Sequence, residues 1–547
     1  MAKAIVRWHW RYLALLWLLW WAWTQSLSFS TPLTGWIKLA VMGAVLWYGL
    51  GFVKVFLDKV LPHTGKDPKV VRGVELATSA SLLHVLELTA RGIPHTDERG
   101  NVTPEWRKAE SDLRRDPAKY HDKRVFDGWV RLAQTPIPPA NEALHIAITA
   151  STGAGKSVAL RGLLADIRAR GDRAIVIDNG GEFGAEFGAP GDLVLSPFDN
   201  RSLGWNLVNE IRESHDWMRM ARSVVPDGQG SERAWHEMAQ KLLANLGMNT
   251  HVDNAELLRI ATGYNAEALQ PLLAGTSSSV LTQDGGDRLL TNIRSVFGTV
   301  LQCWQFMRGG GFSLREYMQS TDPRWLWVPF KESELGVSRD LIACWMDILV
   351  SAGLERTEGG QNTWIIIDEL DTLGELASLI AATTKLRKRN VRVVVAFQSY
   401  SQLVQTYGRE RASTLLNCFS NKLILRSVDG ETAEKLAREL GERERWKESS
   451  TSQGQSASST SSLQREQAVM PSQIQNLPDL QGYINLAGDY PIGRCQVSLE
   501  ATKPRHGPVA YPAGLPTYQD DDRSPQEAVA AQTSLSIVQP ASEARRA

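Results

Sequence analysis

Hydrophobic residues change their spacing several times along this chain, and the first change sets residues 1–60 apart from the rest. Residues 12–29 and 37–56 are two nearly continuous apolar runs, and Lys38 and Lys54 are the only charged residues within them. Each run approaches the roughly 20 residues that span a bilayer. Basic residues before the first run and after the second predict that both ends face the cytoplasm. The pattern therefore predicts an N-terminal two-helix transmembrane hairpin in a multi-pass protein whose bulk is cytoplasmic.

Two other interpretations of these runs are a cleaved signal peptide and a hairpin buried in a core. A signal peptide is disfavoured because a second apolar run follows and no good small-residue cleavage site is present. The lengths of the runs and their flanking charges together favour the membrane over a buried hairpin. The rest of the chain would then lie in the compartment that contains ATP.

From residue 144 onward, short apolar runs alternate with segments of helical spacing. Continuous β-branched runs separated by helices indicate a mostly parallel sheet covered on both faces. We therefore expect an α/β domain built from residues 141–204 and 313–507. The runs that predict its strands are residues 144–149, 174–177, 193–195, 325–328, 364–367, 391–396 and 423–425.

The remaining segments differ in pattern from this α/β region. Residues 205–312 show mainly helical periodicity, which predicts an all-α domain inserted into the α/β domain. Residues 61–140 form a cytoplasmic lead-in, within which residues 70–91 have helical spacing. Residues 441–467 are rich in serine, threonine, glutamine and charge, which is typical of either a mobile loop or a protruding hairpin. The polar tail at residues 508–547 is predicted to be disordered.

The strongest motif lies between the apolar run at residues 144–149 and a helical run at residues 158–168. This strand–loop–helix context is where the pattern G-x-x-x-x-G-K-[ST] binds nucleotide phosphates. Gly153 and Gly155 let the backbone turn so that N–H groups face an anion, and the helix N-terminus adds its positive end. Lys156 would reach the β and γ phosphates. The predicted nucleotide-binding residues are Ala150, Ser151, Thr152, Gly153, Ala154, Gly155, Lys156 and Ser157.

One residue departs from this motif. Ala150 stands where the pattern has its first glycine, and a methyl group is small enough to be a tolerated variant there. A glycine-rich turn that binds nothing is the alternative, and the flanking strand and helix disfavour it.

Two carboxylates follow the apolar run at residues 364–367. A buried strand delivers Asp368 and Glu369 to its carboxyl end, where open α/β sheets bind their ligands. We expect Asp368 to bind Mg²⁺ together with Ser157, and Glu369 to activate the attacking water as a general base. Gln398 ends the next predicted strand and would contact the γ phosphate or the water. A strand that ends in an ordinary charged turn, followed by an ordinary loop glutamine, is the alternative.

Basic residues follow the helix between these two strands. Such a run is usually a solvated helix end. In a ring of ATPases, however, an arginine of one subunit can reach the γ phosphate bound by its neighbour. Arg387 is the best candidate for this catalytic role, and Arg389 is the second choice. For Asp178 and Glu182, which follow the second strand, contact with nucleotide, contact with a neighbour and helix capping all stay open.

The overall composition narrows the function less than the motifs do. The 547 residues include 60 basic and 60 acidic side chains, so the net charge does not point to nucleic acid. A few basic groups per subunit are nevertheless enough to hold DNA phosphates. The four cysteines are far apart and form no C-x-x-C pair, which argues against a disulfide framework or a zinc site.

Together these segments resemble the TraD/TrwB type of type IV secretion coupling proteins. The resemblance rests on the two N-terminal spans, the A-S-T-G-A-G-K-S loop, the segment from Asp368 to Gln398 and the late P-S-Q-I-Q-N-L-P-D-L stretch. It extends from the hairpin to about Leu499. The Walker segments alone are shared by many P-loop ATPases, whereas the segment from Asp368 to Gln398 is much more specific.

This resemblance implies a RecA-like P-loop domain in a homo-hexamer at the bacterial cell inner membrane. It implies an ATPase that uses ATP and Mg²⁺ and couples a relaxase–DNA substrate to a type IV secretion channel in conjugation. The implied partners are single- or double-stranded DNA, relaxase, accessory proteins and channel components. The positions that match the family's functional residues are Lys156, Ser157, Asp368, Glu369, Gln398 and Arg387.

Three alternative functions remain open at this point. The first is a DNA translocase of the FtsK/HerA kind, a class that commonly has more membrane spans or none and lacks the inserted helical domain. The second is a membrane-anchored secretion ATPase that moves protein substrates. The third is a nucleotide-gated scaffold that recruits substrates without hydrolysis. Stimulation of ATP hydrolysis by DNA, stimulation by a protein alone, or the absence of hydrolysis would separate them.

Overall fold

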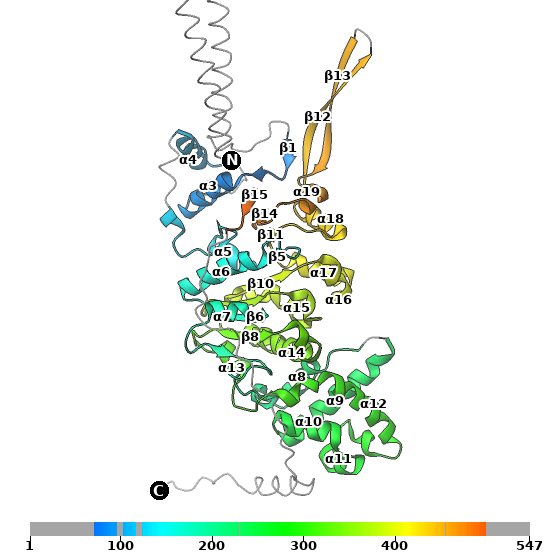
Figure 1. Cartoon of the computed structure of the whole chain (residues 1–547). Coiled ribbons are helices and arrows are strands. Elements are labelled where there is room, and N and C mark those ends of the chain that lie inside the picture. Colours follow the sequence, from blue (N-terminus) through cyan, green and yellow to red (C-terminus); the bar gives the residue numbers. More distant parts are fainter. Residues whose placement is uncertain (1–69, 96–101, 116–122, 229, 454–455, 499–547) are drawn as a thin grey trace, which may run out of the picture. The chain divides into compact units, whose positions relative to one another are not determined.

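The computed structural model describes residues 70–95, 102–115, 123–228, 230–453 and 456–498 (Figure 1). The two apolar runs that predict the transmembrane hairpin lie outside these residues, as does the predicted disordered tail. Within the part of the chain that the structure describes, no helix is both long and apolar enough to cross a bilayer.

A ten-stranded mixed sheet forms the centre of the described chain. Seven strands, from β11 to β7, are parallel to their neighbours, whereas β14 is antiparallel to both β11 and β15. The expected mostly parallel sheet is therefore confirmed. In order across the sheet, the strands are β2 (Leu76–Ala77), β15 (Ile492–Gln496), β14 (Gln481–Asn485), β11 (Asn421–Ile424), β5 (Ile146–Thr149), β10 (Val391–Phe397), β9 (Thr363–Ile367), β6 (Arg173–Asn179), β8 (Leu326–Phe330) and β7 (Leu193–Val194).

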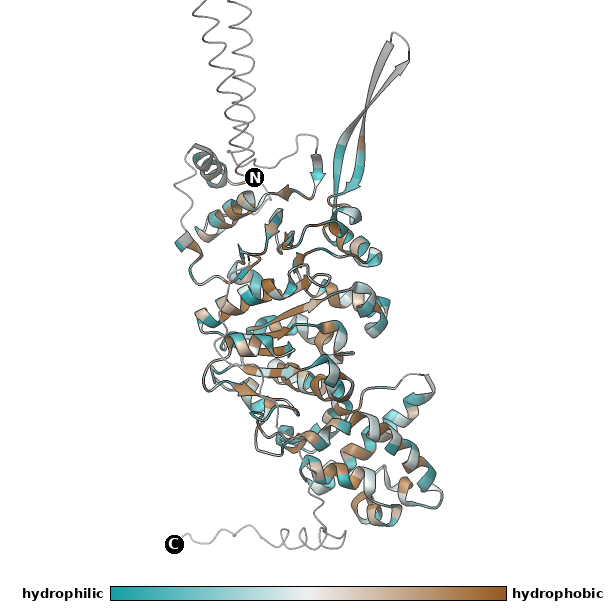
Figure 2. Ribbon diagram, viewed as in Figure 1, coloured by the Kyte–Doolittle hydropathy of each residue, from teal (hydrophilic) through white to brown (hydrophobic). Residues whose placement is uncertain are grey.

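Helices cover both faces of this sheet, which explains why central strands such as β9 are apolar throughout. In β9, Ile365 and Ile367 pack into the core on one face, and Trp364 and Ile366 pack into the core on the other. Figure 2 shows the central strands as predominantly hydrophobic, in contrast to the mixed colouring of the helices. A strand that is buried on both sides gains from apolar residues at every position.

The helices divide between these two faces. Apolar residues of α6 pack on the face that contains Trp364, whereas α14 to α17 pack on the opposite face. The helices are α3 (Ser79–Ala90), α4 (Pro104–Arg115), α5 (Pro139–Glu142), α6 (Lys156–Arg170), α7 (Glu182–Phe187), α8 (Asp216–Val224), α9 (Arg233–Thr250), α10 (Asn254–Gly263), α11 (Ala266–Leu273), α12 (Gly286–Val300), α13 (Leu314–Gln319), α14 (Leu335–Leu354), α15 (Ala377–Leu386), α16 (Tyr400–Tyr407), α17 (Arg409–Asn417), α18 (Gly430–Glu439) and α19 (Pro471–Gln475).

The chain between β7 and β8 is mainly helical and contains α8 to α12, which lie together in Figure 1. Its entry and exit lie side by side, because Trp205 N donates to Arg308 O at 2.9 Å and Phe312 N donates to Gly204 O at 3.1 Å. The Trp205 ring also lies against Trp345 of α14, with centroids 5.8 Å apart. The hydrophobic core of these helices is therefore continuous with the core on one face of the sheet.

The region before the phosphate-binding loop at residues 150–157, which we call the P-loop, differs from the prediction. Residues 70–91 were expected to form a helix from their apolar spacing, but the chain forms β1 (Val70–Gly73) and β2 before α3 begins at Ser79. β1 pairs with β12, and β2 pairs with β15. Partners more than 300 residues away in sequence therefore impose strand structure on this short stretch.

The serine-rich region forms a hairpin, the second of its two expected structures. β12 (Glu442–Gln453) pairs with β13 (Ser456–Gln467) in an antiparallel ladder. Together with β1, these strands form a separate three-stranded sheet. Trp446 and Leu463 face each other across the ladder and are both 45% exposed.

Buried ion pairs join the elements at the amino ends of the parallel strands. Glu142 of α5 accepts hydrogen bonds from Arg170 at 2.7 Å and from Arg392 at 3.0 Å. Asp172 pairs with Arg170 and accepts from Trp364 Nε1 at 2.8 Å. We call these five residues the amino-edge network. It ties α5 and α6 to β9 and β10, because buried charges must be paired to be tolerated.

Candidate functional site

The P-loop follows β5 directly and leads into α6. Gly153 and Gly155 have φ values of 77° and 116°, a region that favours glycine. A Cβ atom at Gly155 would also lie 2.8 Å from Leu480 Cδ2. Ala150 is 1% exposed and is not among the described residues with positive φ. The Ala150 methyl group therefore causes no backbone strain, which accounts for the missing glycine.

Four neighbouring strands bring the predicted site residues to one sheet edge. β10 lies between β5 and β9, and β6 lies on the other side of β9. Because these strands are parallel, their carboxyl ends meet, although Lys156 and Asp368 are 212 positions apart. The Lys156 Nζ atom donates to the Asp368 carbonyl at 3.1 Å. It also lies 3.7 Å from Asp368 Oδ1 and 3.6 Å from Glu369 Oε1.

Glu369 accepts hydrogen bonds on both carboxylate oxygens. The Gln398 amide donates to Oε1, and Asn179 Nδ2 donates to Oε2 at 2.7 Å. The Thr152 hydroxyl in turn donates to Gln398 Oε1 at 3.0 Å. A continuous chain of side-chain hydrogen bonds therefore runs from the P-loop through Gln398 and Glu369 to β6.

Asp368 combines burial with an incomplete set of partners. Its Oδ1 atom is buried and has no hydrogen-bond partner among the described residues. Burial raises the pKa of Asp368 to about 6, Lys156 opposes this rise, and the charge of Glu369 adds to it. A divalent cation would supply the missing partner and favour the ionised carboxylate. The Asp368 carboxylate and the Ser157 hydroxyl, both of which line the cavity, fit a Mg²⁺ ion.

These residues surround a cavity of about 510 Å³. This volume lies within the usual range for small-molecule sites. Asn179 and Glu182 line it from the β6–α7 side, and Asp479 and Leu480 line it from the late part of the chain. All eight predicted P-loop residues except Ala154 line it, as do Asp368, Glu369 and Gln398.

The structure separates the roles left open for Asp178 and Glu182. Asp178 is fully buried and accepts from the backbone N–H groups of Phe183 at 3.4 Å and Gly184 at 2.7 Å, so it caps α7. Burial raises its pKa to about 7. Glu182 is largely exposed, lines the cavity and pairs with Arg161 at 2.9 Å. Of these two residues, only Glu182 is therefore placed to contact a ligand.

Arg387 lies at the opposite edge of the sheet from the other predicted site residues. It directly follows α15 and comes before β10, whereas Gln398 comes after β10. The seven residues of β10 place roughly 20 Å between the two ends. Arg387 is exposed, and Arg389 lies in the same short 3₁₀ turn, Arg387–Arg389. Neither arginine joins the site of its own chain, and a role in a neighbour's site stays a prediction.

Several residues in or beside the cavity were not predicted from the sequence. Asn179 ends β6, and an asparagine before two glycines looks like an ordinary turn. Asp371 accepts the Gln398 backbone N–H at 3.1 Å and has one buried oxygen without a partner. Asp479 and Leu480 lie beside the P-loop, where Leu480 N donates to Ala154 O at 3.0 Å. Two signals were available: Asn179 follows a predicted strand, and Asp479 and Leu480 end the P-S-Q-I-Q-N-L-P-D-L stretch.

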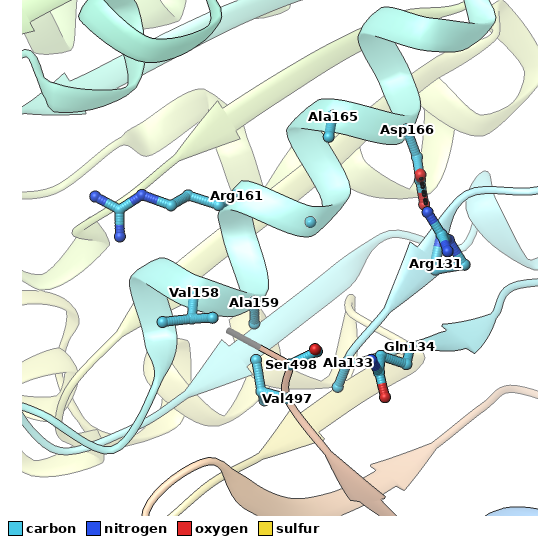
Figure 3. A pocket seen from close by; sticks show the side chains of 11 residues that line it. Arg131, Ala133, Gln134, Val158, Ala159, Arg161, Ala165, Asp166, Val497 and Ser498 are labelled. Carbon is cyan, nitrogen blue, oxygen red and sulfur yellow. Dashed lines mark hydrogen bonds and ion pairs between the residues drawn. The ribbon is translucent and has the colours of Figure 1, made fainter. Parts of the chain in front are cut away.

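A second pocket lies on the outer side of α6 (Figure 3). Its volume is about 60 Å³, which is room for a few water molecules at most. The Arg131–Asp166 ion pair, at 2.6 Å, lies at its edge, and the turn between β3 (Arg131–Leu132) and β4 (Thr135–Pro136) forms part of its wall. This pocket is too small to be the nucleotide site.

The chain is similar to known proteins over most of its length. The family model described as "Type IV secretion-system coupling protein DNA-binding domain" matches residues 130–498. The coupling protein TraD of Escherichia coli strain K12 is 26% identical over 426 residues, which is 74% of this chain and 59% of TraD. The chain thus matches about three fifths of the length of that relative.

Solved structures of a bacterial conjugative coupling protein, TrwB, have a similar fold. The unbound TrwBΔN70 structure is 33% identical, covers 70% of this chain and 91% of TrwBΔN70, and gives a TM-score of 0.65. TrwB in complex with ADP and Mg²⁺ is 29% identical, with 81% and 98% coverage and a TM-score of 0.68. TrwB with the non-hydrolysable ATP analogue ADPNP is 29% identical, with 82% and 99% coverage and a TM-score of 0.67.

Proposed function

The chain belongs to the type IV secretion-system coupling protein family, and from this membership we propose that it is an ATPase that couples DNA to a secretion channel in conjugative transfer. The observation that carries the proposal is the contact of Lys156 with both Asp368 and Glu369 at the edge of one cavity. The TrwB structures with ADP, Mg²⁺ and ADPNP support ATP and Mg²⁺ as the ligands.

Each residue of the site then has a distinct task. Lys156 and the P-loop N–H groups bind the β and γ phosphates, and Ser157 and Asp368 hold the metal. Mg²⁺ supplies charge stabilisation to the phosphate oxygens. Glu369 accepts a proton from the attacking water as a bond forms from the water oxygen to the γ phosphorus. The bond to the bridging oxygen breaks, which leaves ADP and phosphate, while Gln398 orients the water.

The larger assembly is part of the same proposal. We propose a RecA-like domain formed by residues 141–204 and 313–507, with an inserted all-α domain at 205–312. A transmembrane hairpin at 1–60 would anchor it in the bacterial inner membrane, and six copies would form a ring around a DNA-width channel. The similarity to the coupling proteins TraD and TrwB supports the coupling role in this proposal. A relaxase–DNA complex is the proposed substrate, and a type IV channel is the proposed partner.

A hexamer would also give Arg387 a function. Because Arg387 lies at the amino edge of the sheet, it can reach a γ phosphate only in another subunit. We propose that it stabilises the charge of the transition state there. Its exposure and its distance from its own chain's cavity support a role in trans.

A hydrolysis assay on the purified full chain tests the proposal. We expect Mg²⁺-dependent ATP hydrolysis that single- or double-stranded DNA stimulates. Lys156→Ala should lower it by about 10³-fold because the phosphates lose their main cation. Lys241→Ala, at an exposed position of α9, is the matched control and should keep full activity.

The same assay separates the alternatives. Stimulation by a protein substrate but not by DNA would replace the DNA motor with a protein-secretion ATPase. No hydrolysis under any condition would favour a nucleotide-gated scaffold. If Lys156→Ala kept wild-type turnover, the assignment of the nucleotide site would be wrong.

A further inference from the structure

A turn late in the chain lies beside the P-loop, just before β14 begins. β14 is antiparallel to β11, whereas β11 is parallel to β5. The amino end of β14 therefore lies at the carboxyl ends of the parallel strands, where the P-loop begins. We call residues 478–481 the late turn. Asp479 and Leu480 belong to it, and both line the cavity around Lys156.

The backbone of Leu480 adopts a conformation that is unfavourable for leucine. Its φ is 62°, in the left-handed region where Cβ crowds the following carbonyl oxygen and which glycine enters freely. Both of its backbone groups are used in this conformation. The N–H donates to Ala154 O at 3.0 Å, and the carbonyl accepts from Val497 N at 2.7 Å. Backbone strain persists where the surrounding contacts fix the conformation, as these two hydrogen bonds do.

The Leu480 side chain covers the glycine that precedes Lys156. A Cβ atom added at Gly155 would lie 2.8 Å from Leu480 Cδ2 and 3.5 Å from Leu480 Cα. The leucine therefore packs directly on the Gly155 backbone. It also packs against the core that contains the buried face of α6. A glycine at position 480 would avoid the strain but would lose both of these contacts.

The hydrogen bond from Leu480 determines which way one peptide group of the P-loop faces. In a trans peptide, the carbonyl oxygen and the following N–H point in opposite directions, and the described residues contain no cis peptide bond. With the Ala154 oxygen held by Leu480 N–H, the Gly155 N–H points away from the late turn. Loops that bind phosphate do so through N–H groups. A rotated peptide would present its oxygen to the phosphates and repel them.

A second contact of the late turn leads to the start of the P-loop. Asp479 pairs with Arg426 at 2.8 Å, and Arg426 O accepts a hydrogen bond from Ser151 N at 2.8 Å. Ala154 N in turn donates to Ser151 O at 3.0 Å. One connected set of contacts therefore joins the late turn to both Ser151 and Ala154.

We propose that Leu480 is a positioning residue that keeps the Ala154–Gly155 peptide in the orientation that binds nucleotide phosphates. Its left-handed backbone presents the N–H to Ala154 O, and its side chain keeps that backbone against Gly155. The inference rests on the proposed function, because it requires the P-loop to bind a nucleotide. It depends neither on hydrolysis nor on DNA.

Calorimetric titration of the full chain with ADP and Mg²⁺ tests the proposal through two substitutions. Leu480→Ala removes the packing on Gly155 and keeps the strain, so the turn should relax away from Ala154. The affinity for ADP should then fall about tenfold, the weight of one hydrogen bond to a charged group. Leu480→Gly removes the packing and also the strain, so its N–H can stay on Ala154. Its affinity should fall less than about threefold.

Steady-state hydrolysis gives a second measurement on the same variants. The phosphate contacts of the P-loop are made before and during the reaction, so their weakening should raise KM more than it lowers kcat. In Leu480→Ala, the KM for ATP should rise about tenfold, and kcat at saturating ATP should stay within about twofold of the wild type.

Leu477→Ala is the matched control. Leu477 is also partly buried, but it packs against the separate core that contains residues of α18 and α19. This variant therefore loses a similar packing contact away from the P-loop and should bind ADP as the wild type does. Denaturant unfolding of all three variants checks that each is folded.

Three results would overturn the positioning role. The first is wild-type affinity for ADP in Leu480→Ala. The second is an affinity in Leu480→Gly that is as low as in Leu480→Ala, because the side chain would then act by touching the nucleotide. The third is an equal loss of affinity in Leu477→Ala, which would show a general effect of lost packing.

These outcomes are distinct from failure of the proposed function. If the wild-type chain binds ADP and the Leu480 variants bind it equally well, the positioning role fails and the nucleotide site stands. If the wild-type chain binds neither ADP nor ATP, the proposed function fails, and the positioning role fails with it.

Discussion

At the two ends of the parallel strands, buried polar groups differ in whether they have hydrogen-bond partners. At the amino edge, Glu142 accepts from both Arg170 and Arg392, and no side chain of the amino-edge network leaves a buried polar atom unpaired. At the carboxyl edge, Asp368 and Asp371 each keep one buried oxygen without a partner among the described residues. Burial raises the pKa of both carboxyl groups at this second edge.

This difference shows how one sheet serves both stability and ligand binding. Buried polar groups make a structure rigid when every partner is present and are costly when a partner is missing. The amino-edge network finds all its partners within the chain itself. The carboxyl edge leaves a position that a cation or phosphate can complete, so ligand binding lowers the free energy of that edge and leaves the other unchanged.

Glu369→Gln should have the largest effect on the carboxyl edge. The amide cannot accept the proton of water, so turnover should fall by about 10³-fold. Because the P-loop and Lys156 remain, ATP should still bind, and the protein should stall with nucleotide bound. Equilibrium binding of ATP together with a turnover assay checks this. Loss of ATP binding would mean that Glu369 has a structural role, and the contrast between the edges would weaken.

Glu142→Gln should have its effect on stability and not on activity. It leaves the Arg170 and Arg392 guanidinium groups without their shared buried carboxylate, which costs roughly 3–5 kcal/mol of unfolding free energy. The affinity for ATP should not change. Glu237→Gln is the control, because the Arg233–Glu237 pair is exposed and contributes less than about 1 kcal/mol. Denaturant unfolding measures the unfolding free energy of both variants. If both lost the same amount, the amino-edge network would stabilise the fold no more than an exposed ion pair does.

Arg387→Ala tests whether the amino edge also serves a neighbouring subunit. Turnover should fall by about 10²-fold, as expected when one preorganised donor is lost from a transition state. Mixing this variant with Lys156→Ala subunits should restore part of the activity, since each supplies what the other lacks. A mixture no more active than its components would argue against the trans role and leave this edge purely structural.

The smallest expected effect is on the pH dependence of Mg²⁺ binding. The metal needs the ionised Asp368 carboxylate, whose pKa burial raises to about 6. The apparent Mg²⁺ affinity in the presence of ATP should therefore be constant above about pH 7 and fall by up to about tenfold per pH unit below pH 6. Titrations from pH 5 to pH 8 measure it. If the affinity did not change across this range, Asp368 would not be a ligand of the metal.

The same raised pKa values fix the sign of one contribution to stability. Asp178 and Asp368 bind protons more tightly in the folded chain than in the unfolded chain, where a carboxyl group has its ordinary pKa near 4. Between about pH 4 and pH 7 the folded state thus holds more protons. The stability contributed by these two groups is therefore greatest at the acid end of this window and is lost as the pH rises through it.

The central strands could be predicted because their apolar runs report burial on both faces. The runs that predict β5, β6, β9 and β10 each fall within three residues of the observed ends. β14 and β15 were missed because they contain Gly482 and Gly493 and alternate with polar residues. The 70–91 stretch was misread as one helix because strands as short as β1 and β2 depend on distant partners and carry little signal of their own.

The grouping of the site residues could be predicted from the direction of the strands that they follow. Asp368, Glu369 and Gln398 each follow a strand, so a parallel sheet brings them together with the P-loop. Arg387 comes before β10 in the sequence. The same rule therefore places it at the amino edge of the sheet, away from the other predicted site residues. Asn179 and Leu480 depend on pairing register and on a late turn, which single-sequence patterns do not encode.

The pairing of β1 and β2 has a consequence for the order in which the chain is synthesised. Leu76 pairs with Ile492, about 400 residues later. At about 5–20 residues per second, β2 waits roughly 20–80 s on the ribosome before its partner exists. The strands β5, β6, β9 and β10 are complete by Phe397. These four strands can therefore pair with one another during translation, whereas β2 can pair only after Ile492 and Gly493 have been made.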